Sequence, residues 1–407
     1  MKGIIVDGYS TGYHLAKYLL KNGCELMHIQ STKDIPALWK AKFDPSLYSK
    51  NIIYSEQAHA DIKTYHPDFI VAGSELGVAL SEKLSFAFGL KGNQPHSTGL
   101  RRNKHQMMNA VKEAGLAFIE EIAVSPHQTL PAIPPDWYPV VVKPTESAGG
   151  DGVVICHSLQ EVEKAIQHNF SSTNVFGLDN QQILIQRKIS GQQLMVNTIT
   201  VEGQHIILEV WQETRKIIDD KYTVYDFEVL VNDYETAFSG LSAYIKGLLS
   251  ALQVQYGPCH IELFWTDSGP VLIEMAARLQ GGIDGKVSES ALGYSHISAF
   301  AHLIMNKDIP PALSNTHQKQ KSILLINLIF NNAGTIVSSH FDQLVGGLAS
   351  FHSAIGIPKV GDKVPRTTNL ATKVGHFYLV GDDIGQLMSD YYQIRQWEAE
   401  GQLFELA

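Results

Sequence analysis

The chain has 407 residues, of which 44% are apolar and 18% are charged, and its formal net charge is −9. This length is typical of two or three domains with a substantial core. The negative charge argues against a nucleic-acid partner, which would need clustered lysines and arginines. The cysteines, Cys24, Cys156 and Cys259, lie far apart without CxxC spacing, which fits a reducing compartment and argues against a metal cluster.

Export and membrane signals are weak in this sequence. The first apolar run is far too short for a signal peptide and is interrupted by Asp7. The longest late apolar stretch, SILLINLIF at residues 322–330, is at most half of a membrane span. We therefore expect a cytoplasmic protein that does not enter a membrane.

The first ninety residues alternate short apolar segments with helical patterns. Strands are predicted at 3–7, 24–31 and 68–74, and helices at 10–23 and 76–89. This order is typical of a parallel, doubly wound sheet. Gly8 and Gly12 lack the GxGxxG spacing, and no acidic residue ends the second strand. A tight strand-to-helix turn is therefore favoured over a dinucleotide site, and a dinucleotide-dependent oxidoreductase is disfavoured.

Later elements follow in chain order. Helices are predicted at 98–115 and 235–254, with further strands between 181 and 211. The acidic pair Asp219-Asp220 is most simply a solvated turn, and a substrate loop is the alternative for this part of the 212–232 segment. A polar linker at 309–322 precedes a smaller α+β segment.

A glycine-rich loop separates two valine-rich runs in VVVKPTESAGGDGVVICHS, residues 140–158. The runs predict a β-hairpin, but its loop is longer than the two to five residues that a hairpin needs. Gly149, Gly150 and Gly152 allow backbone N–H groups to approach phosphate oxygens closely. Lys143 stands before the loop and supplies a compact positive charge. We therefore interpret the loop as a phosphate flap.

A second hairpin is predicted at 259–278, in CHIELFWTDSGPVLIEMAAR. If Asp267, Ser268 and Gly269 form a three-residue turn, Glu262 lies directly opposite Glu274. Two facing carboxylates repel each other unless a cation bridges them, and Mg²⁺ prefers such hard oxygen ligands. Arg278 would leave the strand near the same face. A solvent-exposed acidic hairpin without a metal is the alternative.

These segments together resemble the ATP-grasp superfamily, and within it the L-amino acid ligases that join two amino acids into a dipeptide. The resemblance covers VDGYSTG, VAGSELGVALSEKL, LKGN, RRNKHQM, VVVKPTESAGGDGV, ISGQQL and HIELFW with GPVLIEMAARLQGG. It implies an α/β and α+β protein with three parts. A Rossmann-like pre-grasp domain spans residues 1–97, an ATP-grasp domain with a mobile lid at about 116–190 spans 98–310, and a small α+β C-terminal subdomain spans 311–407.

The resemblance also implies roles for individual residues. Glu262 and Glu274 would bind Mg²⁺, with Mn²⁺ as a substitute, and Arg278 would be catalytic, contacting the transferred phosphoryl group or the tetrahedral intermediate. The ATP contacts would be Lys104, Lys143, Ser147, Gly149, Gly150, Gly152, Gln186, Lys188, Ile189 and Gln193.

Two positions depart from the common pattern of the superfamily. Gln193 stands where a glutamate usually binds the ribose hydroxyls, so the contact there would carry no charge. Ala276 replaces an asparagine that often follows the second metal glutamate. A small residue there is common among the amino acid ligases, which favours that branch.

The implied reaction is ATP-dependent amide formation between two amino acids through an acyl phosphate, with release of ADP and phosphate. The partners would be small-molecule substrates, namely amino acids, with no nucleic acid and no membrane, and a homodimer is left open. The alternatives are a ligase that joins a non-amino-acid carboxylate to an amine, a ligase of the purine-pathway type, and a nucleotide sensor without chemistry.

The segment after Arg278 contains Gly281 and Gly282, which would leave room for a medium or large side chain beside the acyl-donor carboxylate. A backbone turn that needs positive φ is the alternative for these two glycines.

Overall fold

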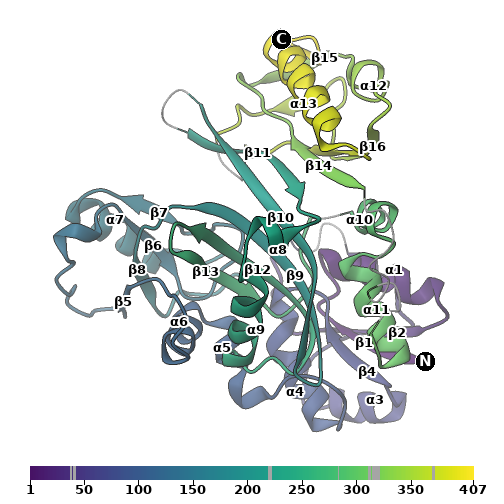
Figure 1. Cartoon of the computed structure of the whole chain (residues 1–407). Coiled ribbons are helices and arrows are strands. Elements are labelled where there is room, and N and C mark those ends of the chain that lie inside the picture. Colours follow the sequence, from purple (N-terminus) through teal and green to yellow (C-terminus); the bar gives the residue numbers. More distant parts are fainter. Residues whose placement is uncertain are drawn as a thin grey trace.

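Four β-sheets carry the fold of this computed structural model, which describes residues 1–36, 39, 43–218, 222–282, 284–309, 313, 321–368 and 372–407. Figure 1 shows the lid sheet (β5 to β8) on the left. The C-terminal unit (β14 to β19) is at the top, and the N-terminal unit (β1 to β4) is below. Among the described residues, no helix combines the length and apolar character needed to cross a bilayer. The predicted combination of α/β and α+β parts is confirmed.

The N-terminal unit is a parallel sheet in the order β3-β2-β1-β4. β1, β2 and β4 are mostly buried because helices cover the sheet, as the doubly wound pattern predicts, whereas the edge strand β3 is mostly exposed. Its elements are β1 (Lys2–Val6), α1 (Thr11–Lys21), β2 (Glu25–Gln30), β3 (Lys50–Ile53), α3 (Ala58–Tyr65), β4 (Phe69–Ala72) and α4 (Val78–Ala87). The sequence pattern did not predict β3 or α3.

A separate antiparallel sheet, in the order β5-β8-β6-β7, occupies the segment predicted as the lid. Its elements are β5 (Glu121–Val124), β6 (Val140–Pro144), β7 (Val154–Cys156), α7 (Leu159–Ser171) and β8 (Ile183–Arg187). β6 and β7 pair as the predicted hairpin, with Val140 opposite Cys156. One face of this sheet is buried against α7, so the lid has its own small core.

The largest sheet is antiparallel, in the order β13-β12-β9-β10-β11-β14-β18-β16. Its first five strands are β13 (Gly269–Ala276), β12 (Tyr256–Thr266), β9 (Gln192–Val201), β10 (Gln204–Ile218) and β11 (Tyr222–Leu230). The helices of this region are α5 (Thr98–Arg102), α6 (Lys104–Glu113), α8 (Tyr234–Ala237), α9 (Leu241–Ala251), α10 (Gly285–Leu292) and α11 (His296–Asn306). Met107 and Met108 of α6 are buried.

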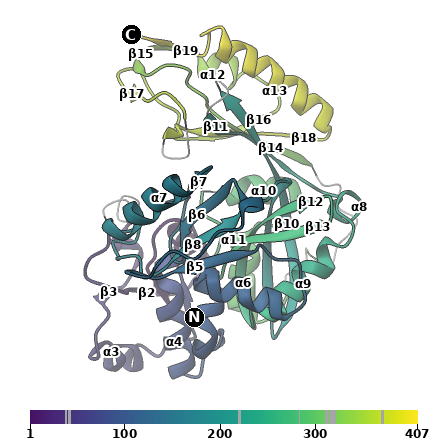
Figure 2. The ribbon, with the colours of Figure 1, turned by 90° about the vertical axis from the view of Figure 1, so that its left-hand side faces the viewer.

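The C-terminal unit continues this sheet rather than standing apart from it. Its elements are β14 (Ser322–Asn327), β15 (Gly334–Ser339), α12 (Phe341–Leu344), β16 (Phe351–Ile355), β17 (Lys363–Val364), β18 (His376–Gly381), α13 (Ile384–Ala399) and β19 (Phe404–Leu406). β14 pairs with β11, and a small sheet, β17-β15-β19, lies beside α12 and α13 (Figure 2). Most of the predicted linker at 309–322, like the turn predicted at Asp219-Asp220, lies outside the described residues.

Two predicted helices are each divided in the structure. The helix predicted at 98–115 is interrupted at Asn103, which caps α6 by accepting from the N–H groups of His105 and Gln106. The helix predicted at 235–254 is interrupted before Leu241, because Gly240 has a φ of +90°. In both cases apolar periodicity continues through a break that a local cap or a glycine imposes.

Candidate active site

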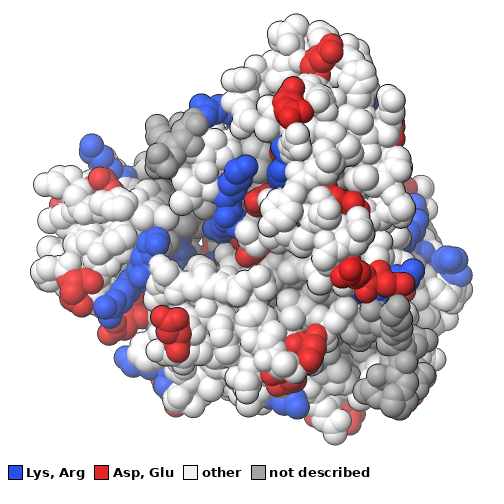
Figure 3. All heavy atoms as spheres, turned by 45° about the horizontal axis from the view of Figure 1, so that its top comes forward, with Lys and Arg blue, Asp and Glu red and all other residues white. Residues whose placement is uncertain are grey.

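A cavity of about 560 Å³ separates the lid sheet from the large sheet. In Figure 3 this face of the molecule is hollowed between the lid on the left and the C-terminal unit at the top, with basic side chains around the hollow. The predicted site residues that line the cavity are Lys104, Lys143, Ser147, Gly149, Gly150, Gln186, Lys188, Ile189, Gln193, Glu262 and Glu274. Residues predicted from five separate segments of the sequence are thus brought into one space.

Glu262 on β12 and Glu274 on β13 lie directly opposite each other, as predicted. The predicted three-residue turn is wrong, since Thr266 pairs with Gly269 across a two-residue turn. A bulge at Ile273 then adds one residue to β13 and restores the facing of the two glutamates. The side chain of Gln193 on β9 donates from Nε2 to Glu262 Oε2 at 3.3 Å.

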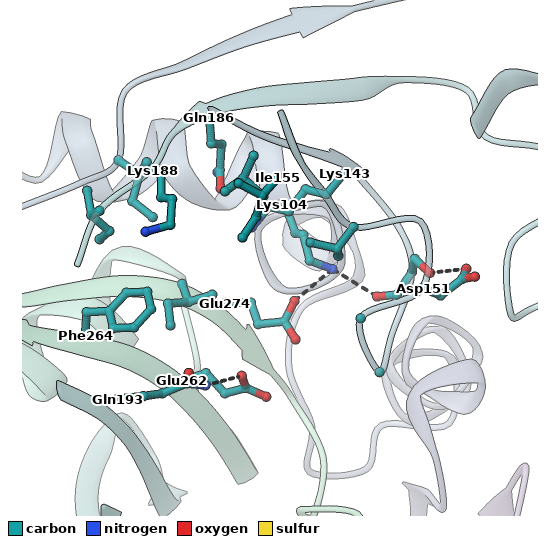
Figure 4. A pocket seen from close by; sticks show the side chains of 18 of the residues that line it. Lys104, Lys143, Asp151, Ile155, Gln186, Lys188, Gln193, Glu262, Phe264 and Glu274 are labelled. Atoms are coloured by element: carbon teal, nitrogen blue, oxygen red, sulfur yellow. Dashed lines mark hydrogen bonds and ion pairs between the residues drawn. The ribbon is translucent and has the colours of Figure 1, made fainter. Parts of the chain in front are cut away.

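Lys104 connects the acidic hairpin to the glycine-rich loop. Its Nζ lies 2.9 Å from Glu274 Oε2, as Figure 4 shows, and it donates to the carbonyl oxygen of Ser147 at 2.9 Å. Burial alone would raise the pKa of Glu274, but Lys104 and Lys143 outweigh it and lower that pKa. Glu274 therefore stays ionised, which a cation ligand requires.

Lys143 is buried in β6 and faces the same group of charges. Burial, assisted by the nearby Lys104, lowers the pKa of Lys143 to about 8, although Glu274 and Glu262 oppose this shift. Two lysines and two glutamates thus share one end of the cavity, and an anion placed there would favour the charged form of both lysines.

The glycine-rich loop is braced at its base and open at its tip. Ser147 Oγ donates to Asp151 Oδ2 at 2.7 Å, and the same oxygen accepts from the N–H of Val175 at 2.8 Å. Gly149 and Gly150 have φ values of +65° and +74°, and among the described residues no heavy atom beyond the adjacent residues lies within 4 Å of the Cβ position of either. The tip therefore leaves its backbone accessible from the cavity, which a phosphate flap needs.

Strand β8 of the lid borders the cavity and leads to Lys188 and Ile189, which are among the predicted ATP contacts. The buried Gln186 donates from Nε2 to Glu121 Oε2 at 2.7 Å, and the opposite oxygen of Glu121 lies 2.6 Å from His105 Nδ1. Lys188 and Ile189 follow at the lining of the cavity.

Four predicted residues do not line this cavity. Gly152, with a φ of +71°, packs against Pro144 and Asn169 and serves the turn. Gly281 approaches Ser10 of the N-terminal unit, and Gly282 has a φ of +79° with open space around it. Gly152 and Gly282 have structural reasons for glycine, whereas a Cβ on Gly281 would lie at ordinary contact distance, 3.4 Å, from Ser10 Oγ. The structure does not bring Gly281 or Gly282 to the cavity.

Arg278, the fourth, lies in an adjacent cavity of about 20 Å³ that shares Lys104, Ser147, Ala148 and Glu274 with the large one. Its Nε lies 3.0 Å from Glu75 Oε2, and Arg102 Nη1 lies 2.7 Å from the other oxygen of Glu75. Burial would raise the pKa of Glu75, but Arg102 and Arg278 outweigh it and lower that pKa. Arg278 is therefore held just beyond the lysine–glutamate end by a carboxylate that the sequence analysis did not single out.

Several lining residues were not predicted. Apolar side chains line the cavity from both sheets, namely Ile119, Val141, Val153 and Ile155 from the lid and Phe264 and Ile273 from the large sheet. Arg215 and Tyr225 come from β10 and β11, within the 212–232 segment, which is a long hairpin rather than a loop in its described part. Alternation with Glu262 could have identified Phe264, whereas the sequence gives no local signal for Arg215 or Tyr225.

Comparisons with known proteins agree with this geometry. A family model described as an ATP-grasp domain matches residues 137–286. Dapdiamide A synthase from Enterobacter agglomerans is 32% identical over 315 residues, which are 74% of this chain and 73% of the relative. An L-amino acid ligase structure from Bacillus licheniformis has a TM-score of 0.74 at 14% identity, over 97% of both chains. A carboxyaminoimidazole ribonucleotide synthase from Aspergillus clavatus, complexed with ATP, has a TM-score of 0.66 at 14% identity, over 98% of both chains.

Proposed function

The chain belongs to the ATP-grasp family of ligases, and on that premise we propose that it joins the carboxyl group of one amino acid to the amino group of another. Dapdiamide A synthase, to which the chain is similar over most of both lengths, is a synthase by name. The fold of an L-amino acid ligase extends over nearly the whole chain. The reaction consumes ATP and yields ADP, phosphate and an amide.

The observation that supports this proposal most is the meeting of two facing carboxylates and two lysines at one end of a lid-covered cavity. Glu262 and Glu274 come from the large sheet, and Lys143 comes from the lid. Lys104, at the start of α6, contacts both sides. Acidic groups for a metal and basic groups for phosphates are the two requirements of a metal–nucleotide site.

ATP would lie with its base among the apolar side chains near Gln186, Lys188 and Ile189, and with its phosphates beneath Gly149 and Gly150. Gln193 would accept from or donate to a ribose hydroxyl. The carboxylates of Glu262 and Glu274 fit Mg²⁺, which takes one or two protein carboxylates and completes its shell with phosphate oxygens and water. When bound, Mg²⁺ would neutralise charge on the phosphates.

The donor carboxylate would attack the terminal phosphorus of ATP, forming an acyl phosphate and releasing ADP. Lys104 and Lys143 would neutralise the phosphate charge, and the loop would exclude water from the acyl phosphate. The acceptor amine would then attack the acyl carbon, and the C–O bond to phosphate would break as the phosphate takes up the proton that the nitrogen loses, which leaves the amide and hydrogen phosphate. Arg278 would stabilise the negative oxygen of the tetrahedral intermediate. To reach it, Arg278 would partly leave its ion pair with Glu75.

The alternatives are less well supported. A purine-pathway ligase shares the fold, but the likeness at 14% identity concerns the fold alone. A ligase for a non-amino-acid carboxylate would use the same residues and differ only in the donor pocket. A sensor without chemistry would need no arginine beside the phosphate end, and Arg278 lies there.

The proposal is tested by ADP release from the full-length protein with ATP, Mg²⁺ and the amino acids singly and in pairs. We expect release that depends on a particular pair, with a dipeptide identified by mass spectrometry. Arg278→Ala should mainly lower kcat, whereas Lys307→Ala, at the C-cap of α11 and outside the lining of both cavities, should change neither kcat nor KM. If no amino acid serves as donor but another carboxylate supports ADP release, the result would favour a ligase for a non-amino-acid carboxylate.

A further inference from the structure

One wall of the cavity is formed by the hairpin of β10 and β11. Arg215 and Tyr225 line the cavity from this wall. The guanidinium of Arg215 lies 4.7 Å from the centre of the Tyr225 ring, and Arg215 Nε lies 2.5 Å from Glu213 Oε1. Arg215 is 40% exposed, so a ligand in the cavity can reach its guanidinium, whose planar donors match a carboxylate or phosphate oxyanion.

A bulge in β11 aims Tyr225 at this cavity. Thr214 pairs with Phe227 and Arg215 pairs with Tyr225, which leaves Asp226 as one extra residue on β11. In a regular strand Tyr225 and Phe227 would face the same side. Here Phe227 packs against Tyr391 of α13, with ring centroids 4.8 Å apart, while Tyr225 lines the cavity. The bulge therefore reverses the direction of Tyr225.

Side chains from α13 hold the bulge in place. The buried carboxylate of Asp226 accepts from Tyr391 Oη at 2.7 Å through Oδ2 and from Arg395 Nη2 at 2.7 Å through Oδ1. Arg395 Nη2 also donates to the carbonyl oxygens of Asp226 at 3.1 Å and Asn327 at 2.8 Å. The bulge thus finds partners for its carboxylate and its carbonyl oxygen in a helix of the C-terminal unit.

We propose that Arg395 and Tyr391 are positioning residues that act through the Asp226 bulge to orient Tyr225 and Arg215 toward an oxyanion of the bound ligand. This inference rests on the proposed function, because the oxyanion belongs either to ATP or to the carboxylate of an amino acid substrate. Asp226, Tyr391 and Arg395 are not among the residues that line the cavity, so their effect on a ligand passes through the wall.

The test compares variants of the full-length protein by ADP release and by calorimetric titration with ATP. Tyr391→Phe removes only the hydroxyl that Asp226 accepts from, and Arg395→Lys keeps the charge but removes the planar fork. We expect KM for ATP or for one amino acid to rise about tenfold in Arg395→Lys, and less in Tyr391→Phe, while kcat changes little. The substrate whose KM rises identifies the source of the oxyanion.

Ile394→Val is the matched control, because Ile394 is the neighbour of Arg395 on α13, is fully buried and has no polar group for Asp226. It should lower Tm while leaving every KM unchanged. In a protein that already carries Arg215→Ala, Arg395→Lys should raise KM by much less than tenfold, because the residue through which Arg395 acts is gone.

Unchanged KM values and an unchanged ATP affinity in both Arg395→Lys and Tyr391→Phe would overturn the inference, as would full additivity with Arg215→Ala. If Arg395→Lys does not fold, Tyr391→Phe decides alone. If the wild-type protein binds ATP but no pair of amino acids leads to ADP release, the result contradicts the proposed function rather than this inference. In that case the calorimetric titrations use ATP and each candidate carboxylate as probes, and an affinity unchanged for all of them in Tyr391→Phe overturns the inference.

Discussion

The ends of two strands in this molecule both carry a buried ionisable residue followed by glycines, but their surroundings differ. Lys143 lies near the end of β6, before Gly149 and Gly150, and Asp7 directly follows β1, before Gly8 and Gly12. Burial shifts both ionisable groups toward their neutral forms, lowering the pKa of Lys143 to about 8 and raising the pKa of Asp7 to about 6. Only Lys143 borders the large cavity.

The glycines at these two ends are there for opposite reasons. At the loop after β6, the Cβ positions of Gly149 and Gly150 face open space, and both residues have positive φ. After β1, a Cβ on Gly12 would lie 2.5 Å from the carbonyl oxygen of Gly73, and a Cβ on Gly8 would lie 2.1 Å from Tyr48 Oη. The first loop uses the conformational freedom of glycine, and the second uses its small volume.

The largest effect is expected from Lys143→Ala. Removal of this charge should lower kcat/KM for ATP about 10²–10³-fold, since the lysine faces phosphates whose charge changes during transfer. Steady-state ADP release measures the effect. Lys164→Ala, an exposed lysine on the lid helix α7, is the control and should behave as wild type. Equal kinetics for the two variants would show that the β6 end is structural, as the β1 end is.

Gly12→Ala should be the most destabilising of the glycine changes, by about 3 kcal/mol, because the new Cβ meets backbone that cannot move aside. Urea unfolding of the full chain measures the loss. Gly23→Ala, at the end of the same helix, has a φ of +81° and open space, so it should cost only about 1 kcal/mol. A Gly12→Ala variant as stable as Gly23→Ala would contradict the packing argument.

The contrast also explains which parts of the site could be predicted from the sequence. Lys143, the glycine loop and the facing glutamates lie in short segments whose period and turns are local. The pairing of Glu262 with Glu274 was predicted correctly although the turn was not, because the bulge at Ile273 compensates for the shorter turn. A bulge of this kind leaves no local pattern, so only the structure shows it.

The placement of residues that depend on distant partners could not be predicted. Tyr225 faces the cavity because Asp226 bonds to Arg395, which is 169 residues further along the chain. Arg278 itself was predicted, but its place beside the large cavity was not, because it is positioned by Glu75, which is 203 residues before it. Likewise, apolar periodicity predicted continuous helices, whereas the structure has breaks at Asn103 and Gly240, each of which is the N-cap of the next helix. The fold class was predicted because it depends on the order of elements, which the sequence does carry.

Asp7→Asn should sharpen the comparison through pH. Burial raises the folded-state pKa of Asp7 from its ordinary value of 3.8 to about 6, so the stability that the protonated group contributes is lost as pH rises through 6. Asparagine does not titrate, tolerates the φ of +52° and can still accept from the N–H of Ser31.

Relative to wild type, Asp7→Asn should therefore gain about 2 kcal/mol of stability between pH 4.5 and pH 7.5. Urea unfolding of both proteins at the two pH values measures the difference, and kcat should not change. A stability difference that is the same at both pH values would mean that Asp7 is not held at a raised pKa.

The smallest effect on stability is expected from Gly150→Ala. A side chain at a φ of +74° costs about 1 kcal/mol, and no neighbouring atom adds to that cost. If the loop binds phosphate through its backbone, the shifted backbone should also raise KM for ATP, by about tenfold. Gly89→Ala has a matched φ of +67° and equally open space at the end of α4, far from the cavity lining, so it should lose the same stability without a change in KM. Tm and KM measured on both variants separate the two costs, and identical kinetics in both would reduce the loop to an ordinary hairpin turn.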